Sequence, residues 1–134
     1  MEQNNHNMRK ITNTLCVALA ILLTSMMPAD ETITKKGDET IVNTKTLTKS
    51  IRGYKYTTPV EIYIKGGKIT KVVALPTKET PEYFDRAKAV LKKYNGKEVK
   101  KAQTMKVDAV SGATMSSEAL IKNVQEGLKH YNGQ

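Results

Sequence analysis

The clearest pattern of hydrophobic and polar positions lies between Val60 and Leu75. Val60, Ile62 and Ile64 alternate with polar or amphipathic residues, Gly66-Gly67 follows, and residues 68–75 return with several β-branched side chains. Alternation predicts strands with one buried face, and a two-glycine connection predicts a tight turn. We therefore expect a β-hairpin. Its buried face should contain Val60, Ile62, Ile64, Ile69 and either Val72 or Val73.

Two other segments have the helical period. Thr80 suits a helix cap and Pro81 the first helical position, and Asn95-Gly96 suits the end of that helix. A second helix follows in the C-terminal segment, where Gly127 is a weak point. Apolar residues three and four apart define one face of each helix. These faces contain Tyr83, Phe84, Ala87, Leu91 and Tyr94 in the first, and Leu120, Ile121, Val124, Leu128 and Tyr131 in the second.

The other segments of the body are less regular. Residues 30–39 are polar and charged and are predicted to form a linker, whereas the β-branched residues of 40–50 indicate a first strand. Residues 98–107 form a lysine-rich connection in which 105–107 suit a short strand. The predicted fold class is α+β, a small antiparallel sheet with a β-hairpin packed against two amphipathic helices. The domain should cover residues 40–134.

Residues 1–29 have the layout of a secretory leader. Arg9-Lys10 precede an apolar run of 13 residues from Leu15 to Met27, and Pro28-Ala29 follow. As a helix this run would extend roughly 20 Å, short of a hydrocarbon core of roughly 30 Å. A cleaved signal peptide and an uncleaved membrane anchor both remain open, and either predicts an extracytoplasmic domain. If the leader is an uncleaved anchor, we expect the chain to associate with a membrane.

Composition limits the possible classes of function. The chain has 134 residues, 39% of them hydrophobic, enough for one modest core, and its formal net charge of +9 is spread along the sequence. No zinc-ligand spacing, helix-turn-helix pattern or aromatic-rich strand accompanies that charge, so we expect no nucleic-acid partner. The single cysteine, Cys16, lies in the leader, which leaves the body without a disulfide, a cysteine-ligated cluster or a c-type haem. With so few histidines, a protein metal site is not expected either.

The candidate chemistry lies in residues 108–117, where small and hydroxyl-bearing residues lead into the C-terminal helix. Gly112 permits backbone angles closed to other residues, and Ala113 keeps the surface shallow. Thr114 then presents a hydroxyl close to the start of a helix. The free N–H groups and the dipole of a helix N-terminus favour a phosphate at such a position.

Asp108-x-x-Ser111-Gly112-Ala113-Thr114 resembles the flavinylation motif of FMN-binding domains, such as those of the C subunit of the sodium-pumping NADH:quinone reductase and the G subunit of the Rnf complex. In that family a dedicated flavin transferase takes FMN from FAD and esterifies its phosphate to the last Thr or Ser of the motif. The resemblance therefore implies a covalent FMN on Thr114. Met105 and Met115 are candidates to line its ring, although methionines more commonly pack in cores.

The resemblance extends from Tyr54 to Tyr131, through a similar series of Gly-Tyr, Pro, strand, glycine turn and strand. Glu79-Thr80-Pro81 is similar to a Glu-Thr-Pro-Gly loop of the family, with Glu82 where Gly is frequent. It implies a flavin contact for Thr80, and a plain helix cap is the alternative. Ser111 and Gly112 are expected to shape the loop. Asp108 would either accept backbone N–H bonds that fix the turn or help the transferase to present Thr114.

The expected function is that of an extracytoplasmic electron-transfer domain. No glycine-rich nicotinamide fingerprint appears, so we expect an electron carrier that depends on redox partner proteins rather than a stand-alone enzyme. The alternative is a non-redox binding module for non-covalent FMN, another anionic ligand or a partner protein. A hydrolase with Ser111, His130 and Asp108 is disfavoured, because the chain lacks Gly-x-Ser-x-Gly.

Overall fold

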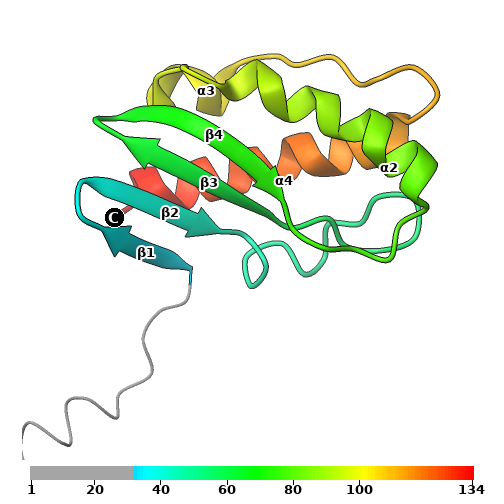
Figure 1. Cartoon of the computed structure of the whole chain (residues 1–134), viewed down its shortest axis with the longest axis horizontal. Coiled ribbons are helices and arrows are strands. Elements are labelled where there is room, and N and C mark those ends of the chain that lie inside the picture. Colours follow the sequence, from blue (N-terminus) through cyan, green and yellow to red (C-terminus); the bar gives the residue numbers. More distant parts are fainter. Residues whose placement is uncertain (1–31) are drawn as a thin grey trace, which may run out of the picture.

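Four strands and a set of helices form two layers (Figure 1). The computed structural model describes residues 32–134. Its elements are β1 (Ile33–Lys36), β2 (Glu39–Asn43), β3 (Val60–Lys65), β4 (Lys68–Ala74), α2 (Pro81–Ala87), the 3₁₀ helix η1 (Lys88–Tyr94), α3 (Val99–Thr104) and α4 (Thr114–Asn132). The strands form one antiparallel sheet in the order β1-β2-β3-β4. The predicted α+β class is confirmed, with three α-helices and η1 in place of two helices.

The predicted hairpin is β3 and β4. Gly66 and Gly67 have φ of 58° and 72°, the left-handed values that a type I′ turn needs at both central positions. Four of the residues predicted to be inward are at most 1% exposed: Val60, Ile62, Ile64 and Ile69. Val72 pairs with Ile62 and packs against the core, whereas Val73 faces outward and is 40% exposed.

The N-terminal part of the sheet differs from the prediction. Ile33–Lys36, within the predicted linker 30–39, forms the edge strand β1 and pairs with β2 through the turn at Gly37-Asp38. Its exposed lysines suit a sheet edge, and a strand of four residues leaves too short a pattern to detect in the sequence. β2 ends at Asn43, so the strand predicted over 40–50 is wrong in its second half. The predicted leader over 1–29 lies outside the described residues.

Buried polar groups fasten the long β2–β3 connection to α4. The side chain of Asn123 is fully buried, and its Oδ1 lies within hydrogen-bond distance of the hydroxyls of Thr44 and Thr48. Asn123 Nδ2 donates to the Ala119 carbonyl at 2.9 Å and to Thr58 Oγ1 at 3.4 Å. The connection therefore has a fixed position beside α4, although it contains no strand or helix.

The helix predicted over 81–94 is divided into α2 and η1. Pro81 stands in the first turn as predicted, but Thr80 makes no side-chain cap bond, and only its carbonyl accepts the Phe84 N–H at 3.0 Å. Phe84, Ala87, Leu91 and Tyr94 are buried as predicted, and Val90 is buried with them. Tyr83 is 49% exposed, so its predicted place on the buried face is wrong.

The connection after Gly96 is also more structured than predicted. Val99–Thr104 forms α3, which packs on α4 and buries Val99 and Ala102. Residues 105–107, predicted as a short strand, form no strand. The backbone before α3 is held against β4 instead, where Ile69 N–H donates to the Lys97 carbonyl at 2.8 Å and Gly96 N–H to the Ile69 carbonyl at 2.7 Å.

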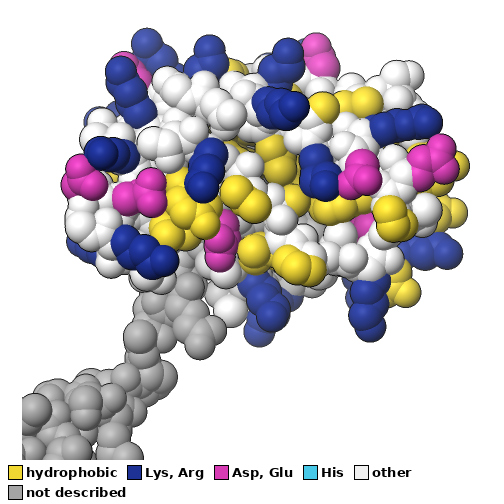
Figure 2. Space-filling model, viewed as in Figure 1, with side chains coloured by type: hydrophobic (Ala, Val, Ile, Leu, Met, Phe, Trp, Pro, Cys, Tyr) yellow, Lys and Arg dark blue, Asp and Glu magenta, His cyan; other side chains and the backbone are white. Residues whose placement is uncertain are grey.

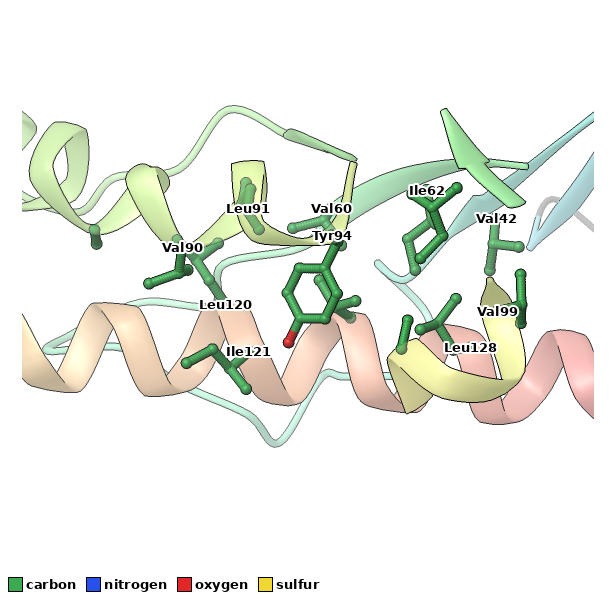
Figure 3. Close-up of a cluster of buried hydrophobic side chains, with 14 of the residues drawn as sticks. Val42, Val60, Ile62, Val90, Leu91, Tyr94, Val99, Leu120, Ile121 and Leu128 are labelled. Atoms are coloured by element: carbon green, nitrogen blue, oxygen red, sulfur yellow. The ribbon is translucent and has the colours of Figure 1, made fainter. Parts of the chain in front are cut away.

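α4 is the central helix of the fold. It packs on β2 and β3 and contacts α2, η1 and α3, and Figure 3 shows Leu120, Ile121 and Leu128 on its inner side facing η1 and the sheet. Gly127 lies against the sheet. A Cβ at this position would stand 2.6 Å from Ile62 Cδ1 and 2.9 Å from Thr44 Cγ2. The glycine predicted as a weak point in the helix therefore allows its close approach to β2 and β3.

Among residues 32–134 no helix is both long and apolar enough to span a membrane.

Candidate functional site

The loop before α4 is a tight turn built around Gly112. The Ala113 N–H donates to the Val110 carbonyl at 3.0 Å, and Gly112 has φ of 82° at the third position of this turn. A type II turn requires a positive φ there, which favours glycine. Ser117 Oγ accepts the Val110 N–H at 3.1 Å. The turn is thereby tied to the first turn of α4.

The N-terminus of α4 has no cap. Its N-cap residue is Ala113, which has no side-chain acceptor, and the first amide with a helical partner is that of Ser117, which donates to the Ala113 carbonyl at 3.0 Å. The amides of Thr114, Met115 and Ser116 have no acceptor within residues 32–134. Three free donors at the positive end of a 19-residue helix form a site suited to an anion.

A pocket of about 470 Å³ opens beside these amides. This volume is within the range of small-molecule and cofactor sites, roughly 300–1,000 Å³. Its walls come from the β2–β3 connection, the start of α2 and the start of α4. The lining residues are Tyr54, Glu79, Thr80, Tyr83, Gly112, Ala113, Thr114, Met115 and Ser116.

Glu79 joins two walls of the pocket. It is 5% exposed, and its Oε1 accepts the N–H groups of Lys55 and Tyr56, each at 2.9 Å. Gly53 makes room for this carboxylate, because a Cβ there would stand 2.5 Å from Glu79 Oε1. Oε2 has no hydrogen-bond partner among the residues described, which leaves it available to a ligand.

Large exposed side chains surround the pocket. Tyr54 is 62% exposed, Tyr83 49% and Met115 54%, and all three line it. Aromatic rings and a methionine that remain uncovered around one cavity are typical of a site for a ligand with a large apolar surface. Together with the free amides, they suit a ligand that has a planar apolar part and an anionic part.

The comparisons with known proteins agree with this geometry. The model of the FMN-binding domain family matches residues 53–129, a segment that contains every residue lining the pocket. The chain belongs to the FMN-binding domain family. No curated protein and no solved structure matched the chain. The family makes this a flavin-binding domain, and the predicted resemblance is confirmed.

The residues of this FMN-binding domain fit the cofactor. The three unpaired amides at Thr114, Met115 and Ser116 suit its phosphate, and the exposed rings of Tyr54 and Tyr83 suit its isoalloxazine. Gly112 lacks a side chain that would narrow the approach to the turn. The pocket therefore has complementary chemistry for both ends of FMN.

The predicted site residues occupy two positions relative to the pocket. Gly112, Ala113, Thr114 and Thr80 line it. Asp108 and Ser111 are exposed and lie outside the lining, and Asp108 makes no hydrogen bond or ion pair with any described residue. The expectation that Asp108 fixes the turn is therefore not met, since Ser117 accepts the backbone N–H bond instead.

The structure also separates the members of the disfavoured hydrolase triad. His130 lies 16 residues beyond Thr114 on α4, which at 1.5 Å per residue is about 24 Å along the helix. Ser111 precedes the start of the helix. His130 therefore cannot act as a base for Ser111.

Of the two methionines predicted as candidates to line the ring, Met115 lines the pocket, whereas Met105 packs against the core. The sequence did not indicate the other lining residues, Tyr54, Glu79, Tyr83 and Ser116, as site residues. The helical period predicts Tyr83 on the buried face, and the sequence before the hairpin has no periodic pattern that would indicate Tyr54. The burial of Glu79 depends on the distant Gly53, so the local sequence around Glu79-Thr80 does not predict it.

Proposed function

We propose that this domain carries FMN joined by its phosphate to Thr114 Oγ1 and relays electrons outside the cytoplasm. One observation supports the linkage above all: the exposed Thr114 lines the pocket as the first residue of the uncapped helix α4. Its hydroxyl is accessible to a second protein and adjacent to amides that suit a phosphate.

The attachment is a group transfer with FAD as the donor. Thr114 Oγ1 attacks the phosphorus on the riboflavin side of the FAD pyrophosphate. An Oγ1–P bond forms, the P–O bond to the AMP phosphate breaks, and AMP leaves. The hydroxyl proton passes to a base of the flavin transferase. The amides of Thr114, Met115 and Ser116 would hold the resulting phosphodiester.

FMN supplies one- and two-electron chemistry when it is bound, and the chain provides its position and surroundings. Tyr54, Tyr83 and Met115, which line the pocket, would pack against the ring. Glu79 Oε2, which has no partner among the described residues, would be able to accept a hydrogen bond from the cofactor. The exposure of the mouth leaves the ring accessible to redox partner proteins.

Two features of the sequence support the cellular role. The chain has no glycine-rich nicotinamide fingerprint, so the electrons come from a partner protein. The basic and apolar leader in residues 1–29 directs the domain out of the cytoplasm, either in secreted form or anchored in the membrane.

The test is intact-mass spectrometry after co-expression with a flavin transferase that is active on a control substrate. Wild type gains the mass of one FMN on Thr114 and fluoresces on a denaturing gel, whereas Thr114→Val gains none. Thr114→Ser, which keeps a hydroxyl, is modified, and Thr80→Val is the matched control because Thr80 also lines the pocket. Flavin still covalently bound to Thr114→Val, or an unmodified wild type, would overturn the linkage.

The same preparations test the non-redox binding module. An unmodified wild type that binds free FMN reversibly would move the assignment to that module, because the pocket and the free amides fit FMN without a covalent bond.

A further inference from the structure

The pocket has an unbalanced charge for a phosphate ligand. Of the nine residues that line it, Glu79 alone carries a formal charge, and that charge is negative. A phosphodiester adds a second negative charge, which the helix dipole offsets only in part. A cation beside the turn would offset the remaining negative charge.

Arg86 is the cation that the structure brings to the turn. Its Nη1 lies 3.8 Å from the position that a Cβ on Gly112 would take. Arg86 follows Tyr83 by one helical turn on α2, and α2 packs against α4. The guanidinium therefore lies over the glycine that precedes the uncapped amides.

Arg86 is held there by a weak pair. Its Nη2 lies 3.3 Å from Glu82 Oε1, four residues earlier on the same helix, and the two side chains are 55% and 68% exposed. An exposed ion pair of this kind contributes little free energy, because water solvates the separated charges almost as well. A competing anion can therefore displace Glu82 from Arg86. A guanidinium also offers five N–H donors, which allows one edge to bind a phosphate.

We propose that Arg86 binds the flavin phosphate beside Gly112 and Thr114, and that Glu82 holds the guanidinium in place until the phosphate arrives. This inference rests on the proposed attachment of FMN to Thr114.

The chain offers a matched control for the charge. Lys88 lies two residues after Arg86 and pairs with Asp85 at 2.7 Å, and it is absent from the pocket lining. Lys88→Gln removes one positive charge and one helix ion pair, as Arg86→Gln does, but it leaves the cation at Gly112.

The first measurement is the rate of FMN incorporation by transferase, FAD and magnesium. Arg86→Gln should slow it about tenfold and Arg86→Lys less, because lysine keeps the charge but not the planar fork. Glu82→Gln should raise the rate about twofold, and Lys88→Gln should match wild type. Wild type that gains no flavin would refute the proposed function itself, which separates the two failures.

The second measurement excludes an effect on transferase docking. The ³¹P resonance of the phosphodiester is recorded in flavinylated wild type, Arg86→Lys, Arg86→Gln and Lys88→Gln, with prolonged incubation for slow variants. A resonance displaced in the Arg86 variants and unchanged in Lys88→Gln supports the contact, whatever the rates. A resonance that is the same in all four proteins would overturn it, even if Arg86→Gln incorporates FMN slowly.

Discussion

At the scale of single residues, most buried polar side chains of the domain have partners that shape the site. Glu79 receives two backbone N–H bonds, and Ser117 receives one from Val110. Tyr94 differs. It is fully buried, and its hydroxyl has no hydrogen-bond partner among residues 32–134. Figure 3 shows the ring between η1 and α4 with the hydroxyl near Ile121.

Because the Tyr94 hydroxyl is buried without a hydrogen-bond partner, we expect the folding stability of the domain to fall at alkaline pH. Burial raises the pKa of Tyr94 from 10.0 to about 12, because the phenolate would lose its hydration. The neutral form therefore stabilises the fold fully below pH 10, and this contribution is lost as pH rises from 10 to 12. By linkage, the loss is about 2–3 kcal/mol in the free energy of unfolding.

Tyr94→Phe tests this directly by urea unfolding at pH 7, 10, 11 and 12. The variant should be more stable than wild type by about 1 kcal/mol at pH 7, because a buried hydroxyl without a partner is removed. It should also lose less stability above pH 10. Tyr54→Phe, at an exposed position, controls for the loss of a hydroxyl. Parallel stability curves for wild type and Tyr94→Phe would contradict the expectation.

Residue-scale predictions from sequence succeeded where the reason was local. The roles of Gly112 and Pro81 were predictable because each depends on the residue's own backbone conformation. Gly112 adopts a positive φ in its turn, and the ring of Pro81 fixes its φ at the start of α2. The roles of Glu79, Ser117 and Arg86 depend on residues from 7 to 26 positions away. No pattern of neighbouring residues carries that information.

At the scale of elements, the contact between α4 and the sheet depends on the absence of a side chain at Gly127. A methyl group there would overlap Ile62 Cδ1 at 2.6 Å and approach Thr44 Cγ2 at 2.9 Å. Both residues belong to the strands and connection that α4 covers, and Thr44 also bonds to Asn123 one turn earlier on α4. Helix propensity and packing therefore act in opposite directions at this position.

We expect packing to dominate in Gly127→Ala. Alanine gains about 1 kcal/mol of helix propensity, but overpacking against a fixed sheet costs about 1–3 kcal/mol, so the net change is a destabilisation of up to about 2 kcal/mol. Thermal and urea unfolding measure it. Gly133→Ala is the control, because a Cβ at Gly133 meets only carbonyl oxygens at 3.5 Å and 3.6 Å. A stabilised Gly127→Ala would indicate that the helix can move away from the sheet.

Elements with a strong pattern were predictable, and short or mixed ones were not. The hairpin and α4 follow from alternation and from helical spacing over many residues. β1 and α3 have four and six residues, too few for a period, and both are stabilised by backbone pairing or packing with distant segments. The change from α2 to η1 gave no signal in the apolar spacing, although four of the five residues predicted to face inward are buried.

At the scale of the whole molecule, positive charge is the dominant surface property. Residues 1–31 contain Arg9 and Lys10 of the 22 basic residues and Glu2, Asp30 and Glu31 of the 13 acidic ones, so residues 32–134 keep 20 and 10, a net charge of +10. Figure 2 shows Lys and Arg side chains spread over the visible face, with Asp and Glu among them. The field thus arises from many dispersed charges rather than one patch.

This field should influence electron exchange with the flavinylated domain. Oxidation of the reduced flavin by ferricyanide, an anion, should slow about threefold or more as ionic strength rises from roughly 10 to 200 mM, because the Debye length falls from roughly 30 Å to below 10 Å. Oxidation by hexaammineruthenium(III), a cation, should become faster over the same range. Stopped-flow absorbance of the flavin measures both rates.

Because the positive charge is dispersed, no single lysine should dominate the salt dependence of these rates. Lys49→Gln and Lys100→Gln, each exposed and outside the pocket lining, should change the salt dependence only slightly, because each removes one of 20 basic residues. A redox partner attracted by this field would carry net negative charge around its own cofactor. Equal salt dependence for the two oxidants would show that the net charge of the domain does not affect reactions at the flavin. The inference of a negatively charged redox partner would then be contradicted.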